Sequence, residues 1–189
     1  MTRREQAAFD ARGYWERRLT ETYAVDGVGW AGLGPALNDW MYRVRRRVFV
    51  RALRPHLSRP ETARVLDIGT GTGFYVDRWH ELGFRNVHAS DVSEVAVERL
   101  RERYPSCEVA QLDIGDQSAG TLQRRFDVVS IIDVLFHITS DRRYERAFAN
   151  LARLVKPNGL LSSPRTSCTT AIRGRPNKSI VRSSRSSPC

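Results

Sequence analysis

The sequence is poor in cysteine, and its cysteines show no metal-ligand spacing. Only three occur among 189 residues, Cys107, Cys168 and Cys189. An odd number of widely spaced cysteines excludes a disulfide framework of the kind that holds small secreted domains together, and it provides no zinc site. The sequence therefore predicts neither a disulfide scaffold nor a bound metal.

Long hydrophobic runs are also lacking. No apolar stretch approaches the roughly 18 residues needed to cross a bilayer, so the sequence predicts no membrane-spanning helix. The N-terminus opens Met1-Thr2-Arg3-Arg4-Glu5-Gln6 and continues with charged residues instead of the apolar stretch of a secretory signal. We therefore expect a cytoplasmic protein.

Acidic residues are missing from the C-terminal part of the chain. All 21 precede Ser163, whereas six of the 31 basic residues follow it, so the net charge of +10 falls to +4 for residues 1–163. The Ser-, Arg- and Pro-rich residues 164–189 predict a disordered basic tail without the aromatic residues that stack on nucleic-acid bases. A nucleic-acid partner is disfavoured. Translation of a GC-rich gene in a shifted frame would produce the same change in composition.

The remaining chain divides into two predicted regions. Residues 1–58 form an N-terminal helical cover, with one helical pattern in residues 3–22 and another from Pro35 to about Leu53. The second pattern contains five arginines, interpreted as a solvated face without a functional role. Residues 59–163 form an α/β domain of the Rossmann-like, doubly wound, mainly parallel type.

This domain is predicted from short apolar segments that alternate with amphipathic ones. Strands are expected at 63–68, 86–91, 107–112, 126–132 and 159–162, and helices near 74–83, 93–104 and 141–155. Right-handed crossovers would place the carboxyl ends of the parallel strands at one rim of the sheet. No convincing strand pattern follows, so the sheet is interpreted as truncated after the fifth strand.

A glycine-rich turn follows the first of these strands, in the segment Val65-Leu66-Asp67-Ile68-Gly69-Thr70-Gly71-Thr72-Gly73. Glycines are required where the backbone adopts positive φ or closely approaches a ligand. Dinucleotide-binding turns space their glycines G-x-G-x-x-G, whereas here they occupy alternate positions, which disfavours NAD.

An apolar strand followed by D-x-G-x-G-x-G resembles motif I of the class I S-adenosylmethionine-dependent methyltransferases, and the resemblance extends over about residues 63–161. It implies S-adenosylmethionine as cofactor, bound by Asp67, Gly69, Gly71 and Gly73. In the same family an acidic residue after the second strand holds the ribose hydroxyls, which corresponds to Asp91, followed by Val92. The third strand implies Asp113 and Ile114 at the adenine, and Asp133 ends the fourth strand near the cofactor.

His137 follows the fourth strand, where a substrate could meet the methyl group, and is the candidate base because histidine accepts protons near neutral pH. Tyr14 and Trp15 are candidates for a lid over the cofactor. The segment Asp133-Val134-Leu135-Phe136 lacks the prolines of an N/D-P-P-Y-like motif, which disfavours a nucleic-acid base as acceptor. A small-molecule, lipid or saccharide acceptor is expected.

Absence of the later strands supports an alternative function, a truncated and catalytically impaired S-adenosylmethionine-binding protein. It also predicts an exposed fifth strand, whose unpaired edge could pair with another chain in an oligomer.

Overall fold

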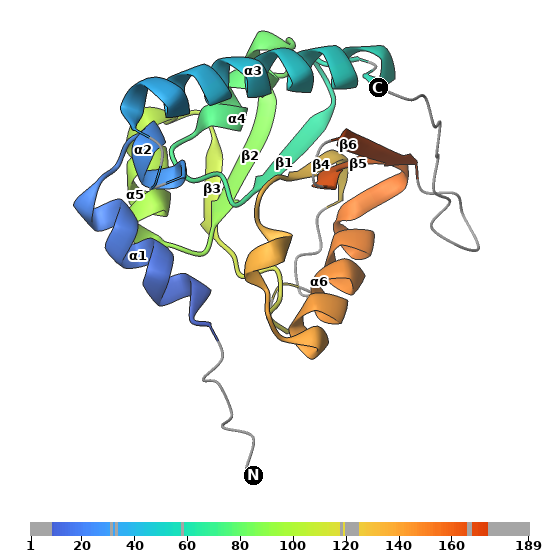
Figure 1. The fold of residues 1–189 in the computed structure, drawn as a ribbon. Helices are drawn as coiled ribbons and strands as arrows, with labels where there is room; N and C mark the ends of the chain where they lie inside the picture. Colours follow the sequence, from blue (N-terminus) through green and yellow to red (C-terminus); the bar gives the residue numbers. More distant parts are fainter. Residues whose placement is uncertain are drawn as a thin grey trace.

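A computed structural model describes residues 9–30, 32, 34–57, 59–117, 119, 125–165 and 168–173. Its centre is a six-stranded sheet of order β3-β2-β1-β4-β5-β6 (Figure 1). The first five strands are parallel and β6 is antiparallel to β5. The predicted α/β, Rossmann-like architecture is therefore confirmed.

Five strands follow the predicted pattern of short apolar segments. They are β1 (Arg64–Ile68), β2 (Asn86–Asp91), β3 (Glu108–Gln111), β4 (Phe126–Ile131) and β5 (Val155–Arg165). The central strands are buried almost throughout, as expected for parallel strands covered on both faces. Because β1 lies between β2 and β4, chain connections leave it in both directions, which creates a crevice at the carboxyl ends of these strands.

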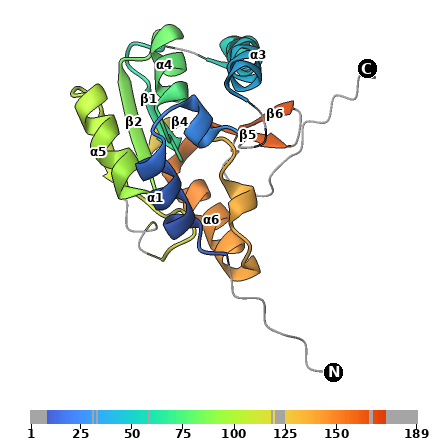
Figure 2. The same ribbon diagram turned by 60° about the vertical axis from the view of Figure 1, so that its left-hand side comes forward.

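Helices cover both faces of the sheet (Figures 1 and 2). On one face, α3 (Pro35–Leu53), α4 (Phe74–Glu81) and α5 (Glu94–Arg103) contribute Phe49, Trp79 and Leu100 to one hydrophobic cluster. On the other, α6 (Asp141–Leu154) contributes Leu151 and Leu154 to a second cluster. The two cores fix the sheet between helical layers and so hold its carboxyl rim rigid.

The N-terminal region is helical, in α1 (Ala11–Glu21), α2 (Val25–Val28), α3 and the short 3₁₀ helix η1 (Arg54–His56). Asp10 caps α1 by accepting the backbone N–H of Gly13, and Pro35 occupies the first position of α3. None of the helices among the described residues is long and apolar enough to cross a membrane.

The C-terminal part of the sheet differs from the expectation. A sixth strand, β6 (Cys168–Arg173), pairs with β5 along Leu160–Arg165, where the sequence indicated the end of the sheet and a disordered tail from residue 164. Pairing satisfies backbone N–H and C=O groups that β5 would otherwise expose, and it needs no apolar pattern. The expected free edge of β5 is therefore occupied by β6. Residues 174–189 of the predicted tail lie outside the described residues.

The turn expected at Lys156-Pro157-Asn158-Gly159 lies inside β5 as an irregularity. Val155 pairs with Phe126 and Leu160 with Val128, so residues 156–159 bulge out between the two pairs. Asn158 has a φ of +64°, a left-handed conformation that asparagine tolerates. The turn signal in the sequence was correct, but it interrupts a strand instead of preceding one.

Candidate functional site

A cavity of about 350 Å³ lies at the carboxyl ends of the strands, a size within the usual range for small-molecule sites. It brings together most of the residues singled out from the sequence, namely Gly69, Gly71, Asp91, Val92, Asp113, Ile114, Asp133 and His137. Asp67 and Gly73 are not among its lining residues. Trp15 lines it as well, whereas Tyr14 does not.

The glycine turn contributes Gly69 and Gly71 to the lining of this cavity. Gly69, Gly71 and Gly73 have φ values of +73°, +56° and +89°, a region that side chains rarely adopt. A Cβ atom on Gly69 would lie 2.1 Å from Cγ2 of Val134, so a side chain cannot be accommodated there. The turn therefore requires glycine for its positive φ values and because the Val134 side chain packs directly against Gly69.

Asp67 lies beneath the turn, buried among the strands. Its Oδ1 accepts a hydrogen bond of 2.5 Å from the Ser130 hydroxyl, which in turn accepts the indole N–H of Trp79. Its Oδ2 has no hydrogen-bond partner among the described residues. Burial raises the pKa of Asp67 to about 7, against the opposing hydrogen bond from Ser130. The carboxyl group supports the turn from below.

Asp91 connects the second strand to the glycine turn. One carboxylate oxygen accepts the backbone N–H of Gly71 at 2.8 Å and the other accepts that of Ser93 at 3.0 Å. Burial raises the pKa of Asp91, while these two N–H groups oppose the rise. Each oxygen has further lone pairs. The carboxylate is thus held rigidly and can still accept hydrogen bonds from a ligand.

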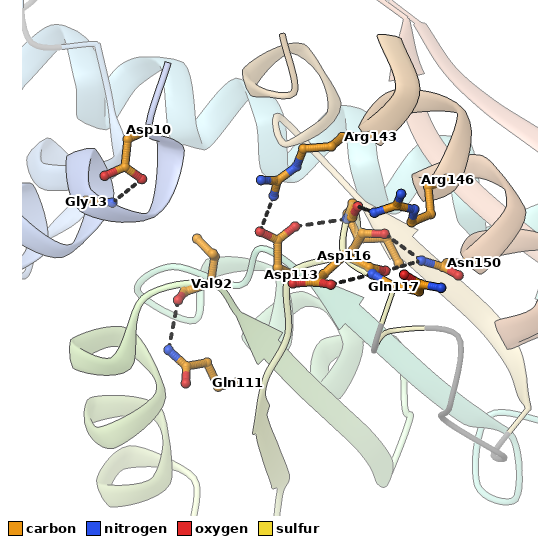
Figure 3. A network of polar contacts seen from close by, with 12 residues as sticks. Asp10, Gly13, Val92, Gln111, Asp113, Asp116, Gln117, Arg143, Arg146 and Asn150 are labelled. Carbon is orange, nitrogen blue, oxygen red and sulfur yellow. Dashed lines mark hydrogen bonds and ion pairs between the residues drawn. The ribbon is translucent and has the colours of Figure 1, made fainter. Parts of the chain in front are cut away.

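The segment after β3 is fixed from α6 (Figure 3). Arg143 pairs with one carboxylate oxygen of Asp113, and the other accepts the backbone N–H of Gly115 at 2.9 Å. The buried side chain of Asn150 donates to the carbonyl oxygens of Ile114 and Asp116, both at 2.9 Å. These contacts, which the sequence did not reveal, position Asp113 and Ile114 at the cavity.

Arg45 is a cavity residue that the sequence analysis missed. Among the five arginines of α3, Arg45 alone is partly buried and lines the cavity. Its guanidinium forms an ion pair with Asp133 and lies 5.4 Å from the centroid of the Tyr42 ring. Asp133 has a φ of +59°, a strained conformation of the kind that is concentrated at functional sites.

His137 ends the short 3₁₀ helix η3 (Leu135–His137) and lies among aromatic rings. Its ring is stacked with Phe9 at a centroid distance of 6.1 Å and meets Trp15 edge-on at 5.2 Å. Burial lowers the pKa of His137, Asp133 opposes this, and Arg18 lowers it further. The lowered pKa favours the neutral imidazole, which is the form that accepts a proton.

The N-terminal helices hold the site from outside through contacts that no sequence signal indicated. Glu16 of α1 accepts the backbone N–H groups of Glu94 at 2.9 Å and Val95 at 3.3 Å, in the first turn of α5. The Tyr23 hydroxyl donates to the Gly71 carbonyl at 3.1 Å. The cover is thus anchored on both the α5 terminus and the glycine turn. Within the described part of the chain, no cluster of three or more metal-ligating side chains occurs.

Comparison with known proteins gives a family match and several similar folds. Residues 65–159 match a family model described as a methyltransferase domain. No curated protein matches in sequence. Similar structures include the N-methyltransferase NodS from Bradyrhizobium japonicum in complex with S-adenosyl-L-homocysteine (19% identity, TM-score 0.54) and the amino pentose methyltransferase CalS10 from Micromonospora echinaspora, with bound S-adenosylmethionine (20%, 0.55). Phosphoethanolamine N-methyltransferase 1 from Haemonchus contortus is also similar (17%, 0.65).

These similarities cover most of this chain but only part of the other proteins. The matches span 64%, 69% and 86% of this chain, and 60%, 56% and 33% of NodS, CalS10 and the Haemonchus enzyme, respectively. At identities near 20% they establish the fold, whereas the family rests on the match over residues 65–159.

Proposed function

We propose that this chain, which belongs to the class I S-adenosylmethionine-dependent methyltransferase family, binds S-adenosylmethionine in the cavity and transfers its methyl group to a small-molecule acceptor. The observation that carries this proposal is the carboxylate of Asp91, held by backbone N–H groups beside the glycine turn. The two features lie on adjacent parallel strands, joined by the hydrogen bond from the Gly71 N–H to Asp91.

The residues at the cavity fit the chemical groups of this cofactor. Asp91 offers acceptor oxygens to a vicinal ribose diol, and Ile114 with Asp113 offers an apolar surface and an acceptor to adenine. On the β4 side, Arg45 and Asp133 present opposite charges, which suit the carboxylate and the amino group of a methionine moiety. Gly69 and Gly71 bring the backbone of the turn to the cavity.

Bound S-adenosylmethionine supplies an electrophilic methyl group, and the protein's tasks are to orient the acceptor, exclude water and accept a proton. Orientation of two reactants in one cavity removes much of the entropic barrier, by about 7 to 11 kcal/mol in ideal cases. Asp67 has a supporting role beneath the turn in this proposal, because its side chain bonds to Ser130 instead of lining the cavity.

Calorimetric titration tests cofactor binding. We expect S-adenosylmethionine and S-adenosylhomocysteine to bind at least about 10-fold more tightly than NAD, which corresponds to roughly 1.4 kcal/mol. The glycine spacing and the ion pair at the methionine end favour the first two ligands. Equal or tighter binding of NAD, or no binding of the two sulfur compounds, would overturn the proposal.

Replacement of His137 by alanine tests proton transfer. We expect kcat to fall by about 100-fold, the lower part of the range for loss of a general base, because the cavity still orients both reactants. The affinity for S-adenosylhomocysteine should stay within about threefold, since His137 faces the aromatic cluster around Phe9 and Trp15. Steady-state rates of S-adenosylhomocysteine release measure the first quantity and calorimetry the second. An unchanged kcat would remove His137 from the mechanism.

A further inference from the structure

We infer that the methyl acceptor is a planar aromatic hydroxyl compound, a phenol, bound between the rings of Phe9 and Trp15 with its oxygen at His137. This inference rests on the proposed methyl transfer and names the acceptor class for that reaction. It follows from the aromatic residues that line the cavity, from the distribution of charge along it and from the ring nitrogens of His137, which form no hydrogen bond within the described residues.

Phe9, Trp15 and His137 form an aromatic wall on one side of the cavity. Phe9 and Trp15 come from the N-terminal cover and contact His137 from two directions, and all three residues line the cavity. Ile138 continues the wall as an apolar neighbour. His137 lies four residues after Asp133 on the segment that leaves β4, so the wall adjoins the methionine end of the cofactor site. Aromatic rings favour a flat, apolar acceptor through offset or edge-to-face contacts.

The charges along the cavity disfavour a cationic amine as acceptor. Asp113 pairs with Arg143, and Asp133 pairs with Arg45 at the end of the cavity assigned to the methionine moiety. The carboxylate of Asp91 is held by backbone N–H groups and assigned to the ribose. That leaves Asp10, which accepts the backbone N–H of Gly13 at the N-terminus of α1, where the helix dipole stabilises negative charge.

A cation lies beside the aromatic wall instead. The Arg18 guanidinium is 5.4 Å from the centroid of the Trp15 ring and acts on His137, lowering its pKa. It is fixed there by donating to the Tyr14 hydroxyl at 2.7 Å and to the Gly29 carbonyl at 2.6 Å. Positive charge at this place repels an ammonium group and stabilises an oxygen that develops negative charge.

The reaction balances with the groups present. A lone pair of the phenol oxygen forms the new bond to the methyl carbon while the carbon–sulfur bond breaks, and its electron pair goes to sulfur, which becomes an uncharged thioether. The phenolic proton passes to an unprotonated nitrogen of His137. Because no ring nitrogen of His137 is engaged in a hydrogen bond within the described residues, the imidazole is available to accept this proton.

Three acceptors with matched carbon skeletons test the inference: 4-methylphenol, 4-methylbenzylamine and 4-methylcyclohexanol. With saturating S-adenosylmethionine, we expect 4-methylphenol to release S-adenosylhomocysteine at least about 10-fold faster than the other two. Trp15→Leu should lower kcat/KM for 4-methylphenol by about 10-fold, and Trp15→Phe should restore most of the loss because it retains an aromatic ring. Trp40→Leu is the matched control, since Trp40 is 56% exposed and lies outside the cavity.

The outcomes separate this inference from the proposed function. Faster turnover of the amine or of the saturated alcohol would overturn the phenol assignment while supporting methyl transfer. Full activity of Trp15→Leu would overturn the aromatic site, and calorimetry with S-adenosylhomocysteine would show that the variant retains the cofactor pocket. Binding of S-adenosylmethionine without turnover of any of the three compounds counts against the phenol, whereas absence of cofactor binding counts against the proposed function itself.

Discussion

Replacement of Asp91 by alanine is expected to weaken the binding of S-adenosylhomocysteine by about 100- to 10,000-fold. The carboxylate accepts the N–H groups of Gly71 and Ser93 and is proposed to accept two ribose hydroxyls. A hydrogen bond to a charged group contributes about 1.5 to 3 kcal/mol, so loss of both ribose contacts amounts to roughly 3 to 6 kcal/mol. Release of Gly71 from Asp91 adds to this loss by loosening the glycine turn. Isothermal titration calorimetry measures the effect directly.

Asp127→Asn is the matched control for this experiment. Asp127 is also an aspartate of the parallel sheet, but it lies near the amino end of β4, where it accepts the backbone N–H of Arg64 and pairs with Lys156. Its replacement should leave the affinity for S-adenosylhomocysteine within about threefold. Thermal unfolding without ligand shows whether Asp91→Ala still folds. A folded Asp91→Ala protein with nearly unchanged affinity would show that the ribose lies elsewhere.

The position of Asp91 could be predicted because it depends only on the strand that Asp91 ends and on the turn that follows. A buried strand ending in an acidic residue places that residue at the carboxyl rim, whatever the rest of the chain does. Arg45 could not be predicted in this way. It is one of five arginines on α3, and only the rotation of that helix against the sheet turns Arg45 inward while Arg43, Arg46 and Arg47 remain exposed.

The contacts of Asp67 and the strand β6 could not be predicted from local sequence patterns. Motif resemblance assigned Asp67 to the cofactor, and that assignment stays a prediction; its side chain bonds to Ser130 and does not line the cavity. The sixth strand lacks an apolar pattern and pairs with β5 along Leu160–Arg165. Both outcomes depend on neighbouring strands that are distant in sequence, Ser130 on β4 in the first case and β5 in the second. Contacts between strands distant in sequence therefore determine both features.

Asp67→Asn is expected to remove the contribution of Asp67 to the pH dependence of stability between about pH 4 and 7, while the raised pKa of Asp91 leaves a second contribution of the same sign. Burial raises the pKa of Asp67 from 3.8 to about 7, so in this range the unfolded chain has lost the proton that the folded chain retains. Folded protein therefore binds more protons, and the free energy of unfolding falls as pH rises through this window and levels off above about pH 7. Each pKa unit corresponds to about 1.4 kcal/mol, which gives a total of roughly 4 kcal/mol. Urea unfolding without ligand at several pH values measures the slope.

Asp127→Asn serves again as control, now with the opposite sign. Burial raises the pKa of Asp127, but the Arg64 N–H and Lys156 outweigh this and lower it below 3.8. Its contribution to stability is therefore present above the unfolded pKa and lost only as pH falls through the folded pKa, below the window in question. Asp127→Asn should destabilise the protein by the same amount at pH 5 and pH 8, whereas Asp67→Asn should gain stability relative to the wild-type protein as pH rises. Parallel stability curves for Asp67→Asn and the wild-type protein would show that the pKa of Asp67 is not raised by burial and would overturn this prediction.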